Sequence, residues 1–543
     1  MAQEVKFSSS HTEPFRPYRL LGWAFFFAVL AFAWFRFSDN TADNDLWGHV
    51  LFGQRNWNAG HIERIDRFSW TAAGAPWINH EVAAEIALGL IHRWTGSSGL
   101  WLFMLAMAVL TAGWALLAGG GRDPVRRWMT LVLFAASANP IALGYAVRPQ
   151  LFTMLAMVAL LATLRRFLAG QSHFGFFLPP LFACWVNLHG GYLAGWLLLL
   201  VAGVMESVAR LRLRRLSRTG NEKATGIPVI VLVAASSTLA LALNPWGFHL
   251  VGWTFETLRL PRPNIAEWQS PLLSVGNAPF YLVLVVSLSA WIFSREPRRA
   301  WEAAVLLLLG LMAMRSQRHV PLFGLANLML TPPHLADAVR RLAPRCGSLL
   351  AAFRRPRMRT AAVIALGAAG VVCLGASLSS PREHPFTIEV PRDTYPVAAI
   401  GFIRAHDLTG NTLTFFDWGE QVLWELPGNP VSFDGRLDTV YSPEIMNAHW
   451  RLYAGESPGP ALDLARAAIA LLPTGSGGVD YLRQAGWKLV YRDPLASVLI
   501  ENPAHFPTLA QSPLPVFAGI HAVQGREPFP DTPPLLGKAA AAR

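Results

Sequence analysis

The sequence predicts a mainly α-helical membrane protein: a polytopic bundle of about eleven spans, followed by a C-terminal α/β domain outside the membrane. Three observations predict this class. Hydrophobic residues make up 53% of the 543 residues and charged residues only 15%, whereas soluble domains carry roughly 25% charge. Apolar runs recur along residues 1–380 but not along residues 381–543, and arginines cluster between them. This composition excludes a disordered chain and a wholly soluble enzyme.

Helices need about 20 apolar residues to cross the hydrocarbon core, and eleven segments approach that length. These segments are residues 20–37, 99–118, 128–146, 150–165, 174–190, 192–209, 227–244, 279–294, 301–314, 319–333 and 361–379. The pair 301–314 and 319–333 is short, which leaves a re-entrant pair as an alternative. Residues 82–94 are amphipathic and too short to span, which predicts an interfacial helix.

The arginine clusters predict the orientation. Under this span list they all fall on one side, which the positive-inside bias identifies as cytoplasmic. The N-terminus is then cytoplasmic, the first span is an uncleaved signal anchor, and residues 381–543 lie outside. A nucleic-acid partner is not expected, because such a surface needs a continuous basic face. The clusters are Arg16 and Arg19; Arg122, Arg126 and Arg127; Arg165 and Arg166; Arg210, Arg212, Arg214, Arg215 and Arg218; Arg295, Arg298 and Arg299; and Arg340 to Arg359.

Residues 381–543 alternate helix-like and strand-like patterns, which predicts a small α/β domain. Helices are expected at residues 395–406, 419–426, 443–453, 459–470 and 479–485, and strands at 412–416, 430–434, 487–492 and 497–501. The Pro-rich tail from residue 506 is expected to be irregular. The domain has no Gly-rich phosphate loop and no nucleophile elbow, so a lid, docking or stabilising role is favoured over a catalytic one.

The first outer loop, residues 38–98, carries the strongest candidate chemistry. Asp43 is the expected N-cap of a helix over residues 44–58. On this helix Asp45 and His49 share a face. A carboxylate beside an imidazole could deprotonate an acceptor hydroxyl. Asp43 and Asp45 could instead hold a divalent cation, Mg²⁺ or Mn²⁺, through oxygen ligands. The plainer alternative is that Asp43 only caps, Asp45 favours the helix dipole and His49 packs.

The same loop places Asn79-His80-Glu81 at the start of the interfacial helix. Glu81 could act as a second catalytic carboxylate, and His80 could bind substrate, around a polar site shared with Asp45. The alternative is a helix start with an acidic first turn, which the helix dipole favours. The tryptophans of this loop fit an interfacial aromatic belt as well as a sugar-binding surface.

Three arginines are expected on the outer side, where the positive-inside bias disfavours them: Arg148, Arg315 and Arg318. Something anionic should compensate their charge. A guanidinium donates two parallel hydrogen bonds to a phosphate, and a lipid phosphate is the anion expected at this depth. Pairing with protein carboxylates or snorkelling to headgroups is the alternative. His189 and Glu267, in outer turns, complete the candidate substrate-binding residues.

In these features the chain resembles the GT-C glycosyltransferases, which include protein O-mannosyltransferases, aminoarabinose transferases and bacterial multi-pass relatives. The shared features are many spans, a large first outer loop with acidic residues after the first span, and an outer C-terminal domain. Asp43-Asn44-Asp45 departs from the superfamily's common Asp-Glu pair. The resemblance implies a bacterial inner-membrane enzyme that moves a sugar from a polyprenyl-phosphate donor to a glycan, lipid or protein acceptor.

Carried over to this sequence, the resemblance implies that Asp45 or Asp43 acts as base or metal ligand. It likewise implies that Arg148, Arg315 or Arg318 holds the phosphate. A transporter or flippase of a lipid-linked saccharide is one competing hypothesis and predicts ionisable groups in the middle of spans. A non-enzymatic membrane scaffold is the other. Two motifs of the C-terminal domain have no role assigned by the sequence: Phe416-Asp417-Trp418-Gly419 and Phe433-Asp434-Gly435-Arg436.

Overall fold

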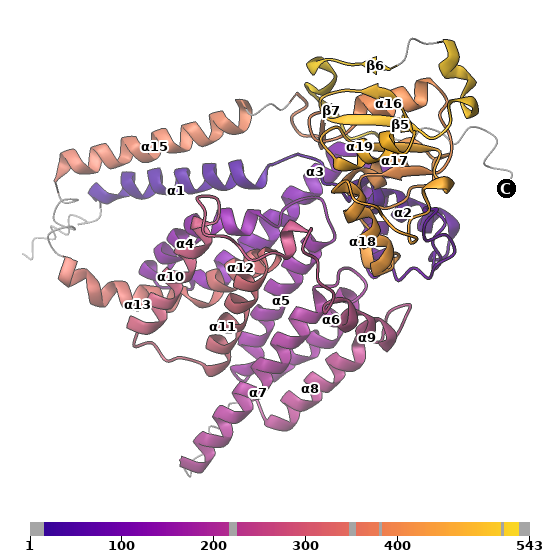
Figure 1. Ribbon diagram of the computed structural model, residues 1–543. Coiled ribbons are helices and arrows are strands. Elements are labelled where there is room, and N and C mark those ends of the chain that lie inside the picture. Colours follow the sequence, from indigo (N-terminus) through magenta and orange to yellow (C-terminus); the bar gives the residue numbers. More distant parts are fainter. Residues whose placement is uncertain (1–15, 217–224, 347–354, 380–382, 512–514, 532–543) are drawn as a thin grey trace, which may run out of the picture.

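The computed structural model describes residues 16–216, 225–346, 355–379, 383–511 and 515–531. A bundle of helices lies beside a smaller region of mixed helices and strands, which residues 383–531 form (Figure 1). We call the latter the C-terminal region. Of the predictions above, Arg218, residues 347–354 of the last arginine cluster and residues 532–543 of the tail lie outside the described residues.

Every predicted apolar segment falls at least partly in a helix. The helices of the bundle are α1 (Arg16–Phe37), α3 (Val82–Gly120), α4 (Pro124–Ala142), α5 (Gln150–Leu168), α6 (Leu178–Trp185), α7 (Tyr192–Leu216), α8 (Ile227–Ala240), α9 (Phe248–Thr257), α10 (Ala278–Phe293), α11 (Ala300–Arg315), α12 (Val320–Leu330), α13 (Pro332–Leu342) and α15 (Pro356–Ser379). By length and composition, α1, α3, α5, α7 and α15 could cross a membrane, and α8 and α10 are shorter apolar helices. The total of eleven spans stays a prediction.

Two of the predicted segments differ in detail from the helices. The segment 174–190 is divided between a 3₁₀ turn (Ser172–Phe177) and the eight-residue α6, because Pro179 and Pro180 lack the N–H groups that would continue a helix through them. The predicted interfacial helix forms the first part of α3. It ends at Gly96, where φ is 64° and ψ is −161°, a conformation that favours glycine.

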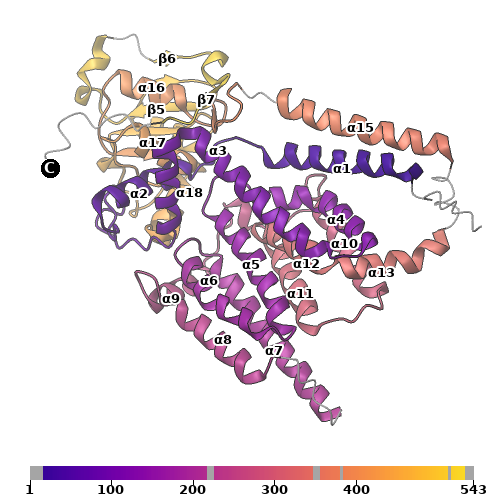
Figure 2. The same ribbon diagram turned by 180° about the vertical axis from the view of Figure 1, so that it is seen from behind.

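The first and last helices of the bundle, α1 and α15, lie side by side in both views (Figures 1 and 2). Their pairing brings the start of the first loop, residues 38–98, to the start of the C-terminal region. Asn40 Nδ2 donates to the carbonyl oxygen of Thr387 at 2.7 Å. The amide of Ala42 donates to Glu389 O at 2.7 Å. Segments more than 340 residues apart in sequence are thereby joined by a side-chain and a backbone hydrogen bond.

The C-terminal region contains two sheets. The larger has the order β2-β3-β5-β4-β6, with β2–β3 and β4–β6 parallel and the other pairs antiparallel. The smaller pairs β1 with β7 in antiparallel fashion. The strands are β1 (Glu389–Pro391), β2 (Thr412–Thr414), β3 (Ile469–Pro473), β4 (Lys488–Arg492), β5 (Ala496–Ile500), β6 (Val516–Phe517) and β7 (Arg526–Pro528), and the helices are α16 (Val397–Ala405), α17 (Gly419–Glu425), α18 (Pro443–Tyr453) and α19 (Gly477–Gln484).

Three sequence predictions for this region are corrected. The expected helix 459–470 is instead a single 3₁₀ turn followed by β3. The prediction was wrong because a short apolar run has the same sequence pattern in a buried helix and in a buried strand. The expected strand 430–434 makes only isolated bridges, from Val431 to Ser69 and to Thr412. The tail is not wholly irregular, since β7 pairs with β1.

The first loop is built into the C-terminal region. Its helix α2 (Leu46–Ala59) packs against α17, and Trp70 is buried in one apolar cluster with Leu413 and Leu452. Trp70 Nε1 also donates to the carbonyl oxygen of Thr412 at 3.2 Å. The loop and the C-terminal region therefore share a core and fold against each other.

Helix α2 contacts the first part of α3 closely at Gly53, so a larger side chain at this position should destabilise the protein. A Cβ on Gly53 would lie 1.9 Å from the carbonyl oxygen of Glu85. Gly53→Ala must therefore separate the two helices, and we expect a loss of about 1–3 kcal/mol in the free energy of unfolding. The measurement is a thermal melt of the purified protein in detergent. Gly113→Ala, where a Cβ meets nothing within 4 Å, should not lower the melting temperature; equal losses would contradict the prediction.

Candidate functional site

The residues around Arg148 form the first polar cluster, which we call the Asp45 cluster. Arg148 lies just before α5 and is surrounded by carboxylates from two loops. Its Nε donates to Asp43, its Nη1 donates to Glu267, and its Nη2 lies 3.2 Å from Asp45 Oδ2. The structure thus brings together four of the residues that the sequence singled out. Three carboxylates share one guanidinium, so the cluster carries an excess of negative charge.

Asp45 lies immediately before α2, whose first residue is Leu46. The sequence prediction of Asp43 as the N-cap is therefore wrong by two residues: Asp45 is the N-cap, yet its side chain makes no capping hydrogen bond. Asp43 instead accepts the Asp45 amide at 3.1 Å and so shapes the turn. The Asp45 carboxylate is left to face the cluster rather than its own helix.

The electrostatic surroundings of Asp45 favour its protonated form. Burial raises the pKa of Asp45 to about 6; Arg148 opposes this rise, and Asp43 adds to it. A carboxyl group that titrates close to neutral pH can both take up and release a proton during a reaction. His49, on the same helix, lies with Nδ1 3.5 Å from Glu85 Oε1 and acts on Asp45 only through its charge.

A second polar cluster, the Glu81 cluster, gathers His80, Glu81, His189 and Arg318. Glu81 Oε1 lies 3.4 Å from His80 Nε2 and 3.6 Å from His189 Nε2. Although burial disfavours its charged form, the two histidines hold the pKa of Glu81 well below its usual range. Glu81 is therefore ionised at neutral pH. The two loop carboxylates Asp45 and Glu81 have pKa values shifted in opposite directions, a pattern that separates a proton-transferring group from a permanent charge.

The hydrogen bonds of His189 fix its tautomer. Its Nδ1 accepts the Gly191 amide at 3.0 Å and lies 2.8 Å from Thr153 Oγ1. Because Nδ1 accepts the Gly191 N–H, the Thr153 hydroxyl, which also accepts from Trp185 Nε1, donates to Nδ1. With Nδ1 occupied as an acceptor, a neutral His189 carries its proton on Nε2, directed at Glu81. Burial lowers the pKa of His189 to about 3, which keeps it neutral.

The three candidate arginines differ in whether protein carboxylates already compensate their positive charge. Arg148 is paired with protein carboxylates, which was the alternative considered from sequence. Arg315 has an exposed side chain, and its carbonyl oxygen accepts a hydrogen bond from Ser270 Oγ. Arg318 lies over the Trp268 ring at 5.1 Å, with Nη2 3.3 Å from His189 Nε2. Within the described ranges neither Arg315 nor Arg318 has an ion-pair partner. Arg318 is the one that is partly buried and lies beside His189, so it is the candidate best suited to an external anion.

The two clusters are electrostatically coupled. His49 acts on both Asp45 and Glu81, and Glu267 is influenced by both Arg148 and Arg318. Of the residues singled out from sequence, the structure groups all except two: His49, whose contact is with Glu85, and Arg315, whose side chain is exposed. The membership of these residues in an active site stays a prediction.

The C-terminal region contributes residues that sequence reasoning missed. Asn44 Nδ2 donates to Asp417 Oδ1 at 2.8 Å, and the Gly48 amide donates to Glu420 Oε2 at 3.0 Å. Asp417 and Gly419 belong to one of the two unexplained motifs, and Glu420 follows it directly. The motif is visible in the sequence, but no feature of the sequence shows that it lies beside the first loop, about 370 residues earlier.

The second motif has a structural role. Arg436 donates through Nη2 and Nε to both oxygens of Asp434 and through Nη1 to Asp66. Its guanidinium lies near the rings of Phe52 and Trp77, at 5.3 and 5.1 Å. All three charged side chains are nearly inaccessible to solvent. This buried ion cluster joins the first loop to the C-terminal region.

No metal-binding arrangement is apparent among the described residues. They include no group of three or more His, Cys, Asp or Glu side chains that could hold an ion. Asp43 and Asp45, the ligands proposed from sequence, each pair with Arg148. The residues present therefore do not fit a divalent cation in this arrangement, and a Mg²⁺ or Mn²⁺ requirement stays an untested prediction.

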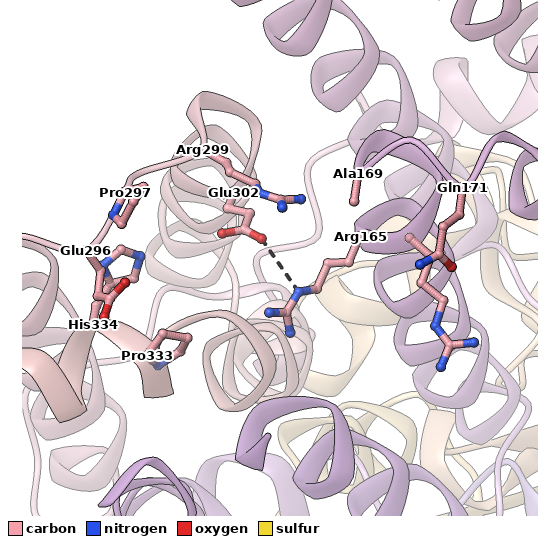
Figure 3. Close-up of a pocket in the computed structure, with 10 residues that line it drawn as sticks. Arg165, Ala169, Gln171, Glu296, Pro297, Arg299, Glu302, Pro333 and His334 are labelled. Carbon is pink, nitrogen blue, oxygen red and sulfur yellow. Dashed lines mark ion pairs between the residues drawn. The ribbon is translucent and has the colours of Figure 1, made fainter. Parts of the chain in front are cut away.

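A pocket of about 290 Å³ lies at the other end of α5 (Figure 3). Arg165, Arg299, Glu302 and His334 are among its lining residues, and Arg165 Nε lies 3.6 Å from Glu302 Oε1. Arg148 precedes the first residue of α5 and Arg165 lies in its last turn, so the Asp45 cluster and this pocket are separated by about 25 Å along the helix. The pocket gathers members of the arginine clusters and is distinct from the candidate site.

No family model and no curated protein matches the chain. Among solved structures it is similar to ArnT from Cupriavidus metallidurans bound to undecaprenyl phosphate, with 15% identity and a TM-score of 0.43 over 88% of this chain and 98% of that chain. It is also similar to the arabinofuranosyltransferase AftD from Mycobacteria, with 16% identity and a TM-score of 0.46 over 89% and 40%. The oligosaccharyltransferase of Archaeoglobus fulgidus gives 10% identity and a TM-score of 0.45 over 83% and 68%.

These three structures are GT-C glycosyltransferases, the superfamily that the sequence of this chain resembles. The likeness covers most of the present chain.

Proposed function

We propose that the protein is a membrane glycosyltransferase that moves a sugar from a polyprenyl-phosphate donor to an acceptor hydroxyl on the outer side of the membrane. One observation carries the proposal. A partly buried carboxylate with a raised pKa, Asp45, pairs with Arg148 and is linked electrostatically through Glu267 to Arg318, an arginine without an ion-pair partner in the described chain. Both lie in loops that connect apolar helices, where a lipid-bound anion can be reached.

The proposed reaction is a single displacement at the anomeric carbon. Asp45 takes the proton of the acceptor hydroxyl, and the acceptor oxygen forms a bond to the anomeric carbon. The bond from that carbon to the phosphate oxygen breaks with its electron pair, which leaves the prenyl phosphate with an additional negative charge. Arg318 is positioned to stabilise this charge, and a preorganised cation of this kind supplies electrostatic catalysis.

The remaining residues of the two clusters would prepare the site. Glu81, ionised and held by His80 and His189, can accept hydrogen bonds from sugar hydroxyls. Arg148 keeps the cluster from accumulating three uncompensated carboxylates. The arginine pocket at the opposite end of α5 supports a cytoplasmic location for that end by the positive-inside bias. The proposal accordingly has Asp45 on the outer side, with a glycan, lipid or protein as acceptor there.

The test of the function is donor consumption. Purified protein in lipid nanodiscs is incubated with a panel of undecaprenyl-phosphate sugars and simple acceptor alcohols, and loss of donor is followed by mass spectrometry. We expect consumption of at least one donor and a loss of about 100-fold or more in Arg318→Ala. Arg315→Ala, three residues earlier with an exposed side chain, is the matched control. Intact donors throughout would favour a scaffold or a transporter of lipid-linked saccharide.

Arg148 yields a prediction of pH dependence. In the wild type, burial sets the pKa of Asp45 at about 6 while Arg148 lowers it, so kcat/KM should rise as the pH passes through about 6. Arg148→Gln removes the opposing positive charge, which raises the pKa of Asp45 further. The acidic limb of the pH profile of kcat/KM should therefore move to higher pH. A limb that stays in place or moves to lower pH would show that Asp45 is not the titrating group.

A further inference from the structure

The N-terminus of α2 is capped by a residue from the other end of the chain. The first amides of a helix have no partner within the helix and need an acceptor from elsewhere. Asp45, the N-cap residue, makes no side-chain capping hydrogen bond. The acceptor for Gly48, the third residue of α2, is Glu420 Oε2 at 3.0 Å. Glu420 is the second residue of α17 and is only 5% exposed.

Two glycines make room for this contact. A Cβ on Gly48 would lie 2.3 Å from Glu420 Oε2, and one on Gly435 would lie 2.9 Å from Glu420 Oε1. The same Cβ on Gly435 would lie 2.4 Å from Asp45 Oδ1. The carboxyl groups of Glu420 and Asp45 thus meet at one backbone position, and any side chain larger than hydrogen there would displace one of them.

Neighbouring contacts hold the same turn from the same side. Tyr395 Oη lies 2.8 Å from the carbonyl oxygen of Ala42 and 2.9 Å from Asn44 Oδ1. Asn44 in turn donates to Asp417. The C-terminal region therefore makes hydrogen bonds to Ala42, Asn44 and Gly48, within the segment that carries Asp43 and Asp45. Among these contacts, Glu420 is the residue that shares the Gly435 position with the Asp45 carboxylate.

We propose that Glu420 is a positioning residue of the transferase site: it caps α2 from the C-terminal region and thereby holds Asp45 where an acceptor hydroxyl can reach it. The C-terminal region is then part of the catalytic unit, rather than a lid or a docking module. The effect on transfer rests on the function proposed above. The capping of α2 by Glu420 does not depend on that function, and it can be measured without any substrate.

The first measurement is amide hydrogen exchange on the full-length protein in nanodiscs, followed by mass spectrometry of peptides that cover residues 43–53. Glu420→Ala removes the acceptor, and we expect exchange at the start of α2 to accelerate about five- to tenfold. Glu420→Gln keeps a carbonyl oxygen at the same place and should exchange like the wild type. Unchanged exchange in the alanine variant, or equal acceleration in both variants, would overturn the proposal.

The second measurement separates positioning from binding. With any donor that the wild type consumes, Glu420→Ala should lower kcat by about tenfold or more while the KM for donor stays within twofold, because a small misplacement of a reacting group slows the chemical step. Glu420→Gln should restore kcat. A rise in KM with kcat unchanged would make Glu420 a binding residue and refute the assignment.

Glu425→Ala is the matched control, because Glu425 is on the same helix but pairs with the exposed Arg404. It should leave both exchange at residues 43–53 and kcat unchanged; a loss equal to that of Glu420→Ala would show a general disturbance of α17 and overturn the proposal. If the wild type consumes no donor, the proposed function fails, whereas the exchange experiment still decides whether Glu420 caps α2.

Discussion

Asp45→Asn is expected to lower kcat for sugar transfer by about 10²–10⁴-fold, the usual contribution of a general base. The asparagine keeps the shape of the side chain but cannot accept the proton of the acceptor hydroxyl. The variant should retain its fold, because Asp45 makes no capping hydrogen bond, and its melting temperature provides that control. Steady-state rates with the consumed donor measure the effect.

Two further variants make this prediction specific. Asp39→Asn changes an exposed carboxylate six residues earlier in the same loop and should leave kcat unchanged. Asp43→Asn tests the alternative base: since Asp43 pairs with Arg148 through Nε and shapes the turn, its loss should cost less than the loss of Asp45. The assignment is wrong if Asp43→Asn abolishes transfer while Asp45→Asn stays within about tenfold of the wild type.

The largest effect on stability is expected from Arg436→Ala. Removal of this guanidinium leaves Asp66 and Asp434 buried without a cation, and breaking a buried ion pair in this way costs about 3–5 kcal/mol. Because Asp66 belongs to the first loop and Asp434 to the C-terminal region, the variant should also loosen their association. Chemical unfolding in detergent measures the first effect, and limited proteolysis of residues 60–80 measures the second.

A surface ion pair supplies the comparison for Arg436. Arg404 pairs with Glu425 while half exposed, so Arg404→Ala should cost no more than about 1 kcal/mol. Arg436→Lys keeps the positive charge but loses the fork that reaches both Asp434 oxygens, so its loss should be intermediate. Equal losses in Arg436→Ala and Arg404→Ala would show that the buried cluster does not hold the two segments together.

The sequence predicted much of the local structure because the relevant signals are local. Apolar runs locate the helices of the bundle, and Gly96 ends the first part of α3 as the break after residue 94 suggested. The incorrect prediction in the C-terminal region also has a physical reason. Residues 459–470 were expected to form a helix, but residues 469 and 470 begin the strand β3, since partners in β2 and β5 decide their conformation.

The candidate site was predicted only in part, for a related reason. Asp43, Asp45, Glu81 and the arginines attract notice because charge is costly beside a membrane, and this is visible without coordinates. Which carboxylate pairs with which arginine is not visible. Arg148 turns out to be paired and Arg318 to lack an ion-pair partner in the described chain, although by sequence the two were equivalent.

The amino-acid order alone therefore predicts a helical membrane protein with acidic residues after its first apolar helix, because hydrophobicity and charge act over neighbouring residues. Only the packed chain shows that Glu420, Asp417 and Arg436 reach back to the first loop. Contacts between residues about 370 positions apart depend on how α1 pairs with α15 and how the C-terminal region closes on α2. No local pattern records that geometry.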